Sequence, residues 1–216
     1  MKKKILIVAH HLTVGGVQKS LISALRNIDY DLNDVTLYVR KNRLDLLPFV
    51  DKRVRVLVNE DKRKYYRQPK AVLLQVLIAI NRLAKKTEKV DALEKRLADF
   101  LREASFTNEA KTYFADKIYD VAVSYWQGYN TLFVDKYINA DKKVMFYQVS
   151  TDEVHHIHQE TMPHYDVIAV EHKDIETALY SWYDDIDGKI KVIENILMKV
   201  YCLKCARSLI SKKQRI

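Results

Sequence analysis

The chain has 216 residues, a formal net charge of +9 at neutral pH and a hydrophobic fraction of 48%. Its size allows one large domain or two small ones, and its apolar content excludes a globally disordered chain. No apolar run has the length of a bilayer span or the form of a secretory signal, so we expect a cytoplasmic protein. The excess of positive charge favours phosphate-rich ligands or an anionic membrane surface.

The two cysteines, Cys202 and Cys205, cannot form a disulfide framework. Their CxxC spacing is found in zinc and redox sites, but no second cysteine pair is present to complete a four-sulfur zinc site. The surrounding sequence predicts a helix, in which positions three apart share a face. Packed or idle cysteines are therefore the favoured interpretation.

The first 27 residues predict a strand, a glycine turn and a helix. The apolar run from Ile5 to Ala9 is continuous, which is typical of a strand buried on both faces of a parallel sheet. Gly15 and Gly16 can take backbone angles that side chains forbid, and they let a ligand approach the start of the next helix. A tight turn without a ligand is the alternative. The helix residues expected to face solvent are Gln18, Lys19, Ser23 and Arg26.

Six more apolar segments predict strands, and helical patterns separate most of them. The predicted strands lie at 35–39, 54–58, 121–124, 143–148, 167–170 and 190–193. This alternation predicts an α/β fold, a Rossmann-like, doubly wound, mainly parallel sheet of about seven strands. We expect one domain over residues 1–195, followed by a basic helix or interdomain linker over 196–216.

Two consecutive helical patterns interrupt this alternation at about 62–115 and predict an αα insertion. The stretch from Lys62 to Lys86 contains eight Lys and Arg and no acid, and Pro69 lies where its helix is expected to start. The apolar face of this helix either covers the sheet, which is the favoured interpretation, or lies on an anionic bilayer. The residues assigned to that face are Val72, Leu73, Leu74, Val76, Leu77, Ile78, Ile80 and Leu83.

Polar side chains follow several predicted strands, at the edge where parallel sheets bind ligands. These residues are His10, His11, Trp126, Gln127, Gly128, Gln148, Glu171 and His172. Their convergence predicts a binding site at the carboxyl edge of the sheet.

A second polar cluster consists of Asp152, Glu153, His155, His156, His158 and His164. Imidazole and carboxylate groups are metal ligands, but the helical His pair of a metalloprotease, with Glu between its members, is missing. A surface cluster is therefore favoured over a metal site, and no bound metal is expected. A histidine of this cluster could still act as a base near neutral pH.

Five segments of the chain, in order, resemble the N-terminal half of the group 1 retaining glycosyltransferases with the GT-B architecture. The segments are IVAHHLTVGGVQKSL, YDVAVSYWQGYNT, KKVMFYQ, YDVIAVEH and KVIEN. The resemblance implies that a sugar is transferred from a nucleotide-sugar to a sugar or lipid-linked acceptor, in cell-surface polysaccharide synthesis. It also implies that this half holds the acceptor and that the nucleotide-sugar is a substrate, with no separate cofactor.

The same resemblance implies which residues bind substrate. Gly15 and Gly16 are expected to line the interdomain cleft with Gln18 and Lys19 nearby, and Gly128 with Tyr129 forms a second cleft loop. The full expected set is His10, Gly15, Gly16, Gln18, Lys19, Gln127, Gly128, Tyr129, Gln148, Glu171 and His172.

Three positions depart from the family pattern. Gln148 stands where the family usually has His, Gln127 where it commonly has Glu, and Glu171 with His172 where it has Ser-Glu. No catalytic residue is assigned, and a second domain or a partner chain is expected to supply the donor site, without which this half is inactive. The alternative function is a non-catalytic binding module derived from the same fold. Nucleic-acid binding is not expected, because no readout motif is present.

Overall fold

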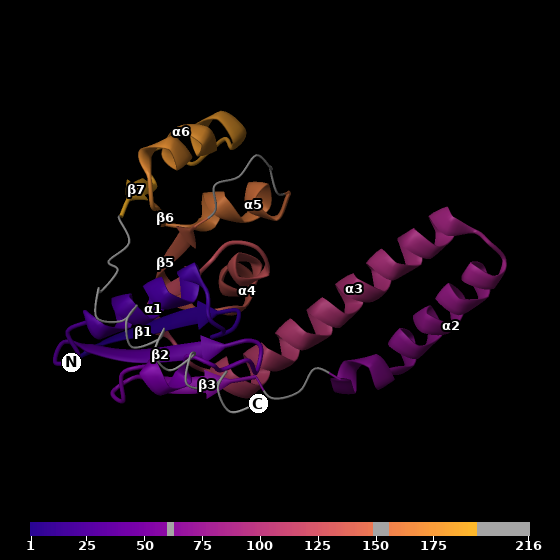
Figure 1. The fold of residues 1–216 in the computed structure, drawn as a ribbon, viewed down its shortest axis with the longest axis horizontal. Coiled ribbons are helices and arrows are strands. Elements are labelled where there is room, and N and C mark those ends of the chain that lie inside the picture. The colour runs from indigo at the N-terminus through magenta and orange to yellow at the C-terminus, as the bar shows by residue number, and fades with distance from the viewer. Residues whose placement is uncertain (60–62, 149–155, 194–216) are drawn as a thin grey trace, which may run out of the picture.

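The computed structural model describes residues 1–59, 63–148 and 156–193, and it confirms the predicted Rossmann-like α/β fold (Figure 1). Its seven strands are all parallel and lie in the order β3-β2-β1-β4-β5-β6-β7. The strands are β1 (Lys3–Ala9), β2 (Asn33–Val39), β3 (Arg55–Val58), β4 (Tyr119–Tyr125), β5 (Ala140–Tyr147), β6 (Val167–Val170) and β7 (Ile190–Val192). Because the order reverses between β1 and β4, the loops after these two strands diverge and leave a crevice where such sheets bind ligands.

Six α-helices connect the strands within the described residues. They are α1 (Gly16–Arg26), α2 (Pro69–Leu83), α3 (Thr87–Glu109), α4 (Tyr129–Tyr137), α5 (His156–Thr161) and α6 (Lys173–Trp182). Short turns of 3-10 helix occupy Leu47–Phe49, Arg63–Arg67 and Met162–His164, and a π-helical turn, Ala110–Phe114, continues α3. The expected C-terminal helix, with Cys202 and Cys205, lies outside the described residues.

The sheet has a separate apolar core on each face. In β1, Leu6 and Val8 join a core with α4 and the C-terminal end of α3, whereas Ile7 and Ala9 join a second core with α1. This alternation follows from the two-residue period of a strand. The three large apolar side chains that α1 buries against the sheet each contribute roughly 1.5–3 kcal/mol. They are Leu21, Ile22 and Leu25.

Two residues of α1 that were expected to face solvent are buried. Gln18 is 6% exposed and Ser23 is 1% exposed. The prediction was wrong because helical spacing alone does not show that the ends of β1 and β4 cover this side of α1. The neighbouring Ser20 hydroxyl, also buried, forms a hydrogen bond of 2.9 Å with the Tyr125 hydroxyl at the end of β4.

The predicted αα insertion forms, but it does not cover the sheet. Helices α2 and α3 pack against each other as a hairpin that extends away from the sheet (Figure 1). Toward α3, α2 buries Ala71, Leu74 and Ile78. The other apolar side chains assigned to its core face are largely solvent-exposed, so the sheet-covering interpretation is wrong. None of the helices in the described part of the chain is long and apolar enough to cross a membrane.

A buried ion pair anchors this hairpin to the sheet. Arg40, directly after β2, lies with its Nε 2.9 Å from Glu109 Oε2 and its Nη2 3.2 Å from Glu109 Oε1 at the end of α3. Tyr38 and Ser105 donate hydrogen bonds of 2.9 and 2.5 Å to the same carboxylate. The guanidinium also lies 4.2 Å from the ring centroid of Phe106. Such bidentate, fully hydrogen-bonded geometry is what a buried charge pair requires.

Candidate functional site

The loops after β1 and β4 meet through three aromatic rings. The Trp126 ring centroid lies 6.2 Å from that of His10 and 6.0 Å from that of His11, both in edge-to-face geometry. Trp126 has a φ of 102°, a conformation that costs a non-glycine residue free energy and that often marks a functional site. The Ser124 hydroxyl helps to hold it, because it donates a hydrogen bond of 3.1 Å to the Trp126 carbonyl.

His11 is held in its neutral form at this crevice. Its Nδ1 lies 2.8 Å from Thr13 Oγ1 and 3.4 Å from Gln18 Nε2. Burial, and then the positive charges of Lys41 and Arg43, lower the pKa of His11 below its usual value of 6.5. Asp45 acts in the opposite direction but more weakly, so these surroundings favour the uncharged imidazole.

The two glycines of the first loop act differently from what was expected. Gly15 has an extended backbone with a φ of −165° and caps α1, and neither glycine is among the positive-φ residues. A Cβ on Gly15 would lie 2.4 Å from Gln18 Oε1, so this glycine makes room for the Gln18 side chain. A Cβ on Gly16 would meet no described atom within 4 Å. The start of α1 thus has space beside Gly16, and no special backbone angle is involved. That a ligand binds there stays a prediction.

Gly128 is the glycine that needs special backbone angles. Its φ of 91° and ψ of −141° lie in a region that only glycine adopts readily, and it caps α4. Its N–H donates a hydrogen bond of 2.9 Å to Nε2 of His158, which is fully buried. One residue earlier, the Gln127 side-chain oxygen accepts a hydrogen bond of 3.2 Å from the Gln148 backbone N–H. The second loop is thereby tied to α5 and to the end of β5.

This arrangement corrects the expected surface cluster of histidines. His158 is in the core, whereas His164 is exposed and its Nδ1 lies 3.0 Å from Asp135 Oδ2. Asp152, Glu153 and His155 lie outside the described residues, and so does the side chain of His156. Within the described part of the chain, no three His, Cys, Asp or Glu side chains are grouped so that they could hold a metal ion.

Gln148 presents a buried amide to the same edge. The residue is 9% exposed, and its side chain lies close enough to the Tyr125 hydroxyl to affect the pKa of that group. Nevertheless, neither amide atom makes a hydrogen bond of normal geometry within the described residues. A buried polar group without a partner costs free energy unless a ligand, water or another residue satisfies it. That Gln148 contacts a substrate stays a prediction.

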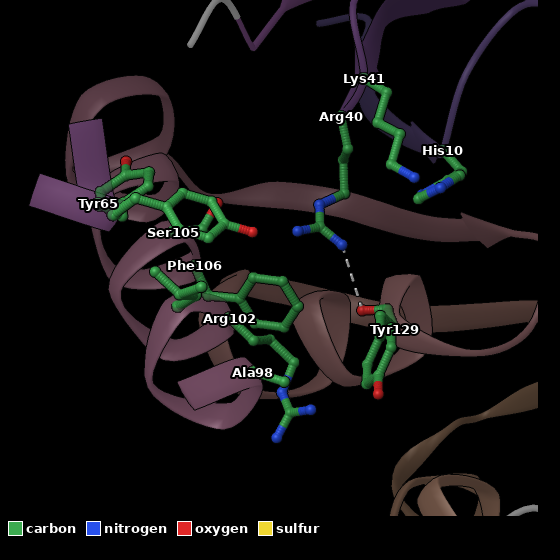
Figure 2. Close-up of a pocket in the computed structure, with 11 residues that line it drawn as sticks. His10, Arg40, Lys41, Tyr65, Ala98, Arg102, Ser105, Phe106 and Tyr129 are labelled. Carbon is green, nitrogen blue, oxygen red and sulfur yellow. Dashed lines mark hydrogen bonds between the residues drawn. The ribbon is translucent and has the colours of Figure 1, made fainter. Parts of the chain in front are cut away.

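Next to this crevice, a cavity of about 260 Å³ lies between the sheet edge and the base of the hairpin (Figure 2). None of the residues that line it is acidic. Arg40 and Lys41 come from the end of β2, Arg102 from α3 and Tyr129 from the start of α4. The lining residues are His10, Arg40, Lys41, Tyr65, Tyr66, Ala98, Leu101, Arg102, Ser105, Phe106 and Tyr129.

The cations of the cavity are not equally available to a ligand. The Arg40 charge is neutralised by Glu109. The Nη2 atom of Arg102 lies 2.6 Å from Asp99 Oδ1, and its Cζ atom lies 4.9 Å from the Tyr129 ring centroid. Lys41 forms no ion pair with any residue that the structure describes. It is therefore the cation best placed to bind an anionic group.

Of the predicted site residues, the structure brings His10 and Tyr129 to the cavity. Around the adjoining crevice lie Gly15, Gly16, Gln18, Gln127, Gly128 and Gln148. Lys19 is on α1 but does not line the cavity, and Glu171 and His172 follow β6, two strands from β4. That these residues bind substrate stays a prediction.

Sequence reasoning missed the cationic part of the cavity. Arg40 and Lys41 directly follow a predicted strand. Polar residues after strands, such as His10, were selected on that ground, so the same criterion could have found these two. Tyr65 and Arg102 carry no such signal, because only the packing of the hairpin brings them to the sheet edge.

Comparison with solved structures supports the same fold class, one half of a GT-B architecture. The complex of Anabaena Alr3699/HepE with UDP and glucose matches with a TM-score of 0.51 at 11% sequence identity, over 96% of this chain and 50% of that one. This chain thus spans half the length of that protein.

Two further solved structures match with lower TM-scores. Sucrose-phosphate synthase from Thermosynechococcus elongatus matches at 13% identity and a TM-score of 0.41, over 99% of this chain and 100% of that one. Arabidopsis thaliana UGT89C1 complexed with UDP matches at 13% identity and a TM-score of 0.44, over 92% and 51%. No family model and no curated protein sequence matches the chain.

Proposed function

We propose that this chain is the acceptor-binding half of a glycosyltransferase that builds a cell-surface polysaccharide in the cytoplasm. The observation that carries the proposal is the acid-free cavity beside the β1/β4 crevice, at the edge where this fold binds ligands. The fold shared with half of Anabaena Alr3699/HepE, whose structure contains UDP and glucose, supports it.

The acceptor in this proposal carries a phosphate or carboxylate group and a sugar ring. Lys41 binds the anion, with Arg102 as a second cation, and the exposed Tyr129 ring packs against the sugar. The open start of α1 at Gly16 faces the diphosphate of the nucleotide-sugar, because backbone N–H groups at a helix N-terminus favour anions.

In the transfer, the bond between the anomeric carbon and the nucleoside diphosphate breaks, and a bond to the acceptor hydroxyl oxygen forms. The proton of the acceptor hydroxyl passes to the departing diphosphate, and the nucleoside diphosphate is released. A second domain or a partner chain supplies the remaining donor contacts, so this half alone is inactive. A non-catalytic binding module is the second candidate, and it is favoured by the side-chain amides of Gln127 and Gln148, which cannot serve as proton-transfer groups.

Tryptophan fluorescence tests the acceptor site. The chain has two tryptophans, so in a Trp182→Phe variant only Trp126, at the crevice, reports. Glucose 6-phosphate and a short-chain prenyl diphosphate sugar are the acceptor probes, and UDP-glucose is the donor probe. We expect an acceptor probe to change the Trp126 emission, and Lys41→Ala to weaken that binding by about tenfold, the loss of one charge-assisted contact.

Lys95→Ala, on the exposed face of α3, removes the same charge away from the cavity and should leave the titration unchanged. A titration in which both variants behave alike, or in which no acceptor probe binds, contradicts the proposed site. Sugar transfer from UDP-glucose when the second half is supplied separates the transferase from the binding module.

A further inference from the structure

The outward face of α2 is an apolar surface without a partner in the described structure. Its five large side chains are 45–87% exposed, although the helix is 15 residues long and packs firmly on α3 through its other side. These residues are Val72, Leu73, Val76, Ile80 and Leu83. A contiguous apolar surface of this kind marks a site of interaction.

The charges of α2 and of its flanking residues are all positive, although Arg82 is paired with Glu94 of α3. Between Lys62 and Lys86 the sequence has no acid, and exposed cations lie at both ends of α2. They are Arg67, Lys70, Arg82, Lys85 and Lys86. The carboxylates of the hairpin are all on the other helix, as Glu88, Asp91, Glu94, Asp99, Glu103 and the buried Glu109 of α3.

We propose that the outward face of α2 docks on an anionic lipid bilayer. The helix lies in the plane of the interface, with its apolar side chains at the acyl boundary and its terminal cations at the lipid phosphates. At 1.5 Å per residue, α2 offers about 22 Å of such surface. The projection of the hairpin away from the sheet leaves this face accessible (Figure 1).

A bilayer fits this face better than a second copy of the chain does. An isologous dimer through α2 would bring the cations of one helix end against those of its partner, and no carboxylate on α2 is present to offset the repulsion. Anionic lipid headgroups supply the opposite charge. Tyr66, 50% exposed, lies at the base of α2 and lines the cavity, so docking places the cavity mouth close to the membrane.

Vesicle co-sedimentation of the full chain tests this inference. The probes are vesicles of phosphatidylcholine alone and of phosphatidylcholine mixed with phosphatidylglycerol. We expect binding to the mixed vesicles that weakens as salt is raised, because surface charges are screened. We expect little binding to phosphatidylcholine alone.

Three double variants, each lowering the net charge by two, separate the contributions. Val76→Glu with Ile80→Glu should reduce binding by at least tenfold, since charged groups replace apolar ones at the acyl boundary. Lys85→Gln with Lys86→Gln should reduce it by about tenfold, through the loss of two cations near the headgroups. Lys89→Gln with Lys95→Gln, on α3, is the matched control and should bind within about twofold of wild type.

All six side chains that these variants replace are solvent-exposed, so the substitutions should not disturb the core. Circular dichroism verifies that each variant is folded. The inference is overturned if the mixed vesicles do not bind, or if the three variants bind equally. Light scattering that shows a dimer abolished by the Val76/Ile80 change also overturns it, in favour of a second copy. Acceptor binding in the cavity is measured without lipid. A failure to bind vesicles would therefore not count against the proposed acceptor site.

Discussion

Replacing Arg40 with methionine is expected to be one of the most destabilising single changes in the chain. The side chain is 2% exposed, and its partner Glu109 is fully buried. Without Arg40, the Glu109 carboxylate loses its cation inside the core, although Tyr38 and Ser105 still donate hydrogen bonds to it. Breaking a buried pair by removing one partner costs about 3–5 kcal/mol, because it leaves a charge uncompensated.

The magnitude follows from the geometry of the pair. Both guanidinium contacts to Glu109 are lost, and so is the position of the cation over the Phe106 ring. In the double variant Arg40→Met with Glu109→Met, no buried charge remains, and the free energy of unfolding should return to within about 1–2 kcal/mol of wild type.

Urea unfolding followed by circular dichroism measures these differences. The reasoning is refuted if the single variant loses less than about 1 kcal/mol, or if the double variant is no more stable than the single one. The first result would mean that the pair contributes no anchoring, and the second that packing around Arg40 matters more than its charge.

Further changes test the loops of the site. Gly128→Ala should lower the free energy of unfolding by about 1–3 kcal/mol because of its φ of 91°, whereas Gly16→Ala should cost no more than about 0.5 kcal/mol; thermal unfolding compares the two. The pKa of His11 is lowered in the folded state, so the unfolded state binds more protons and stability falls as pH drops below 6.5. His11→Gln should flatten that dependence in urea titrations, and an unchanged slope would contradict it. An anion bound near Lys41 should raise the pKa of His11, which NMR can follow in the presence and absence of glucose 6-phosphate. If saturating glucose 6-phosphate left the pKa of His11 unchanged, an anion site at Lys41 would be contradicted.

The fold could be predicted from the sequence because its local signals agree with one another. Continuous apolar runs such as the one from Ile5 to Ala9 mark strands buried on both faces, and all seven predicted strands form. The helical spacing after Pro69 also identified α2 correctly. These signals are local, so they do not depend on how the elements pack.

The direction of helix faces could not be predicted in the same way. Periodicity shows that α2 has an apolar face, but not whether protein, lipid or solvent lies against it. On α1, Gln18 looked solvent-facing and is buried, because the side chain fills the space that Gly15 leaves and reaches His11. Both errors concern tertiary packing, which the spacing of one helix does not contain.

The site was predicted where it follows strand ends and missed where it depends on the hairpin. His10, Trp126 and Gln148 were expected at the carboxyl edge, and the structure places them there. Arg102 lines the cavity because α3 packs at the sheet edge, where Glu109 of α3 pairs with Arg40. A long-range contact of this kind leaves no pattern in the neighbouring sequence.

The most direct test of the acceptor-binding account is an NMR map of the chain with glucose 6-phosphate and with the short-chain prenyl diphosphate sugar. The account predicts that amide shifts cluster at His10, Lys41 and Tyr129, and that they disappear in Lys41→Ala but persist in Lys95→Ala. Shifts that are absent from these residues, or scattered over the basic surface and unaffected by Lys41→Ala, would contradict an acceptor site in the cavity.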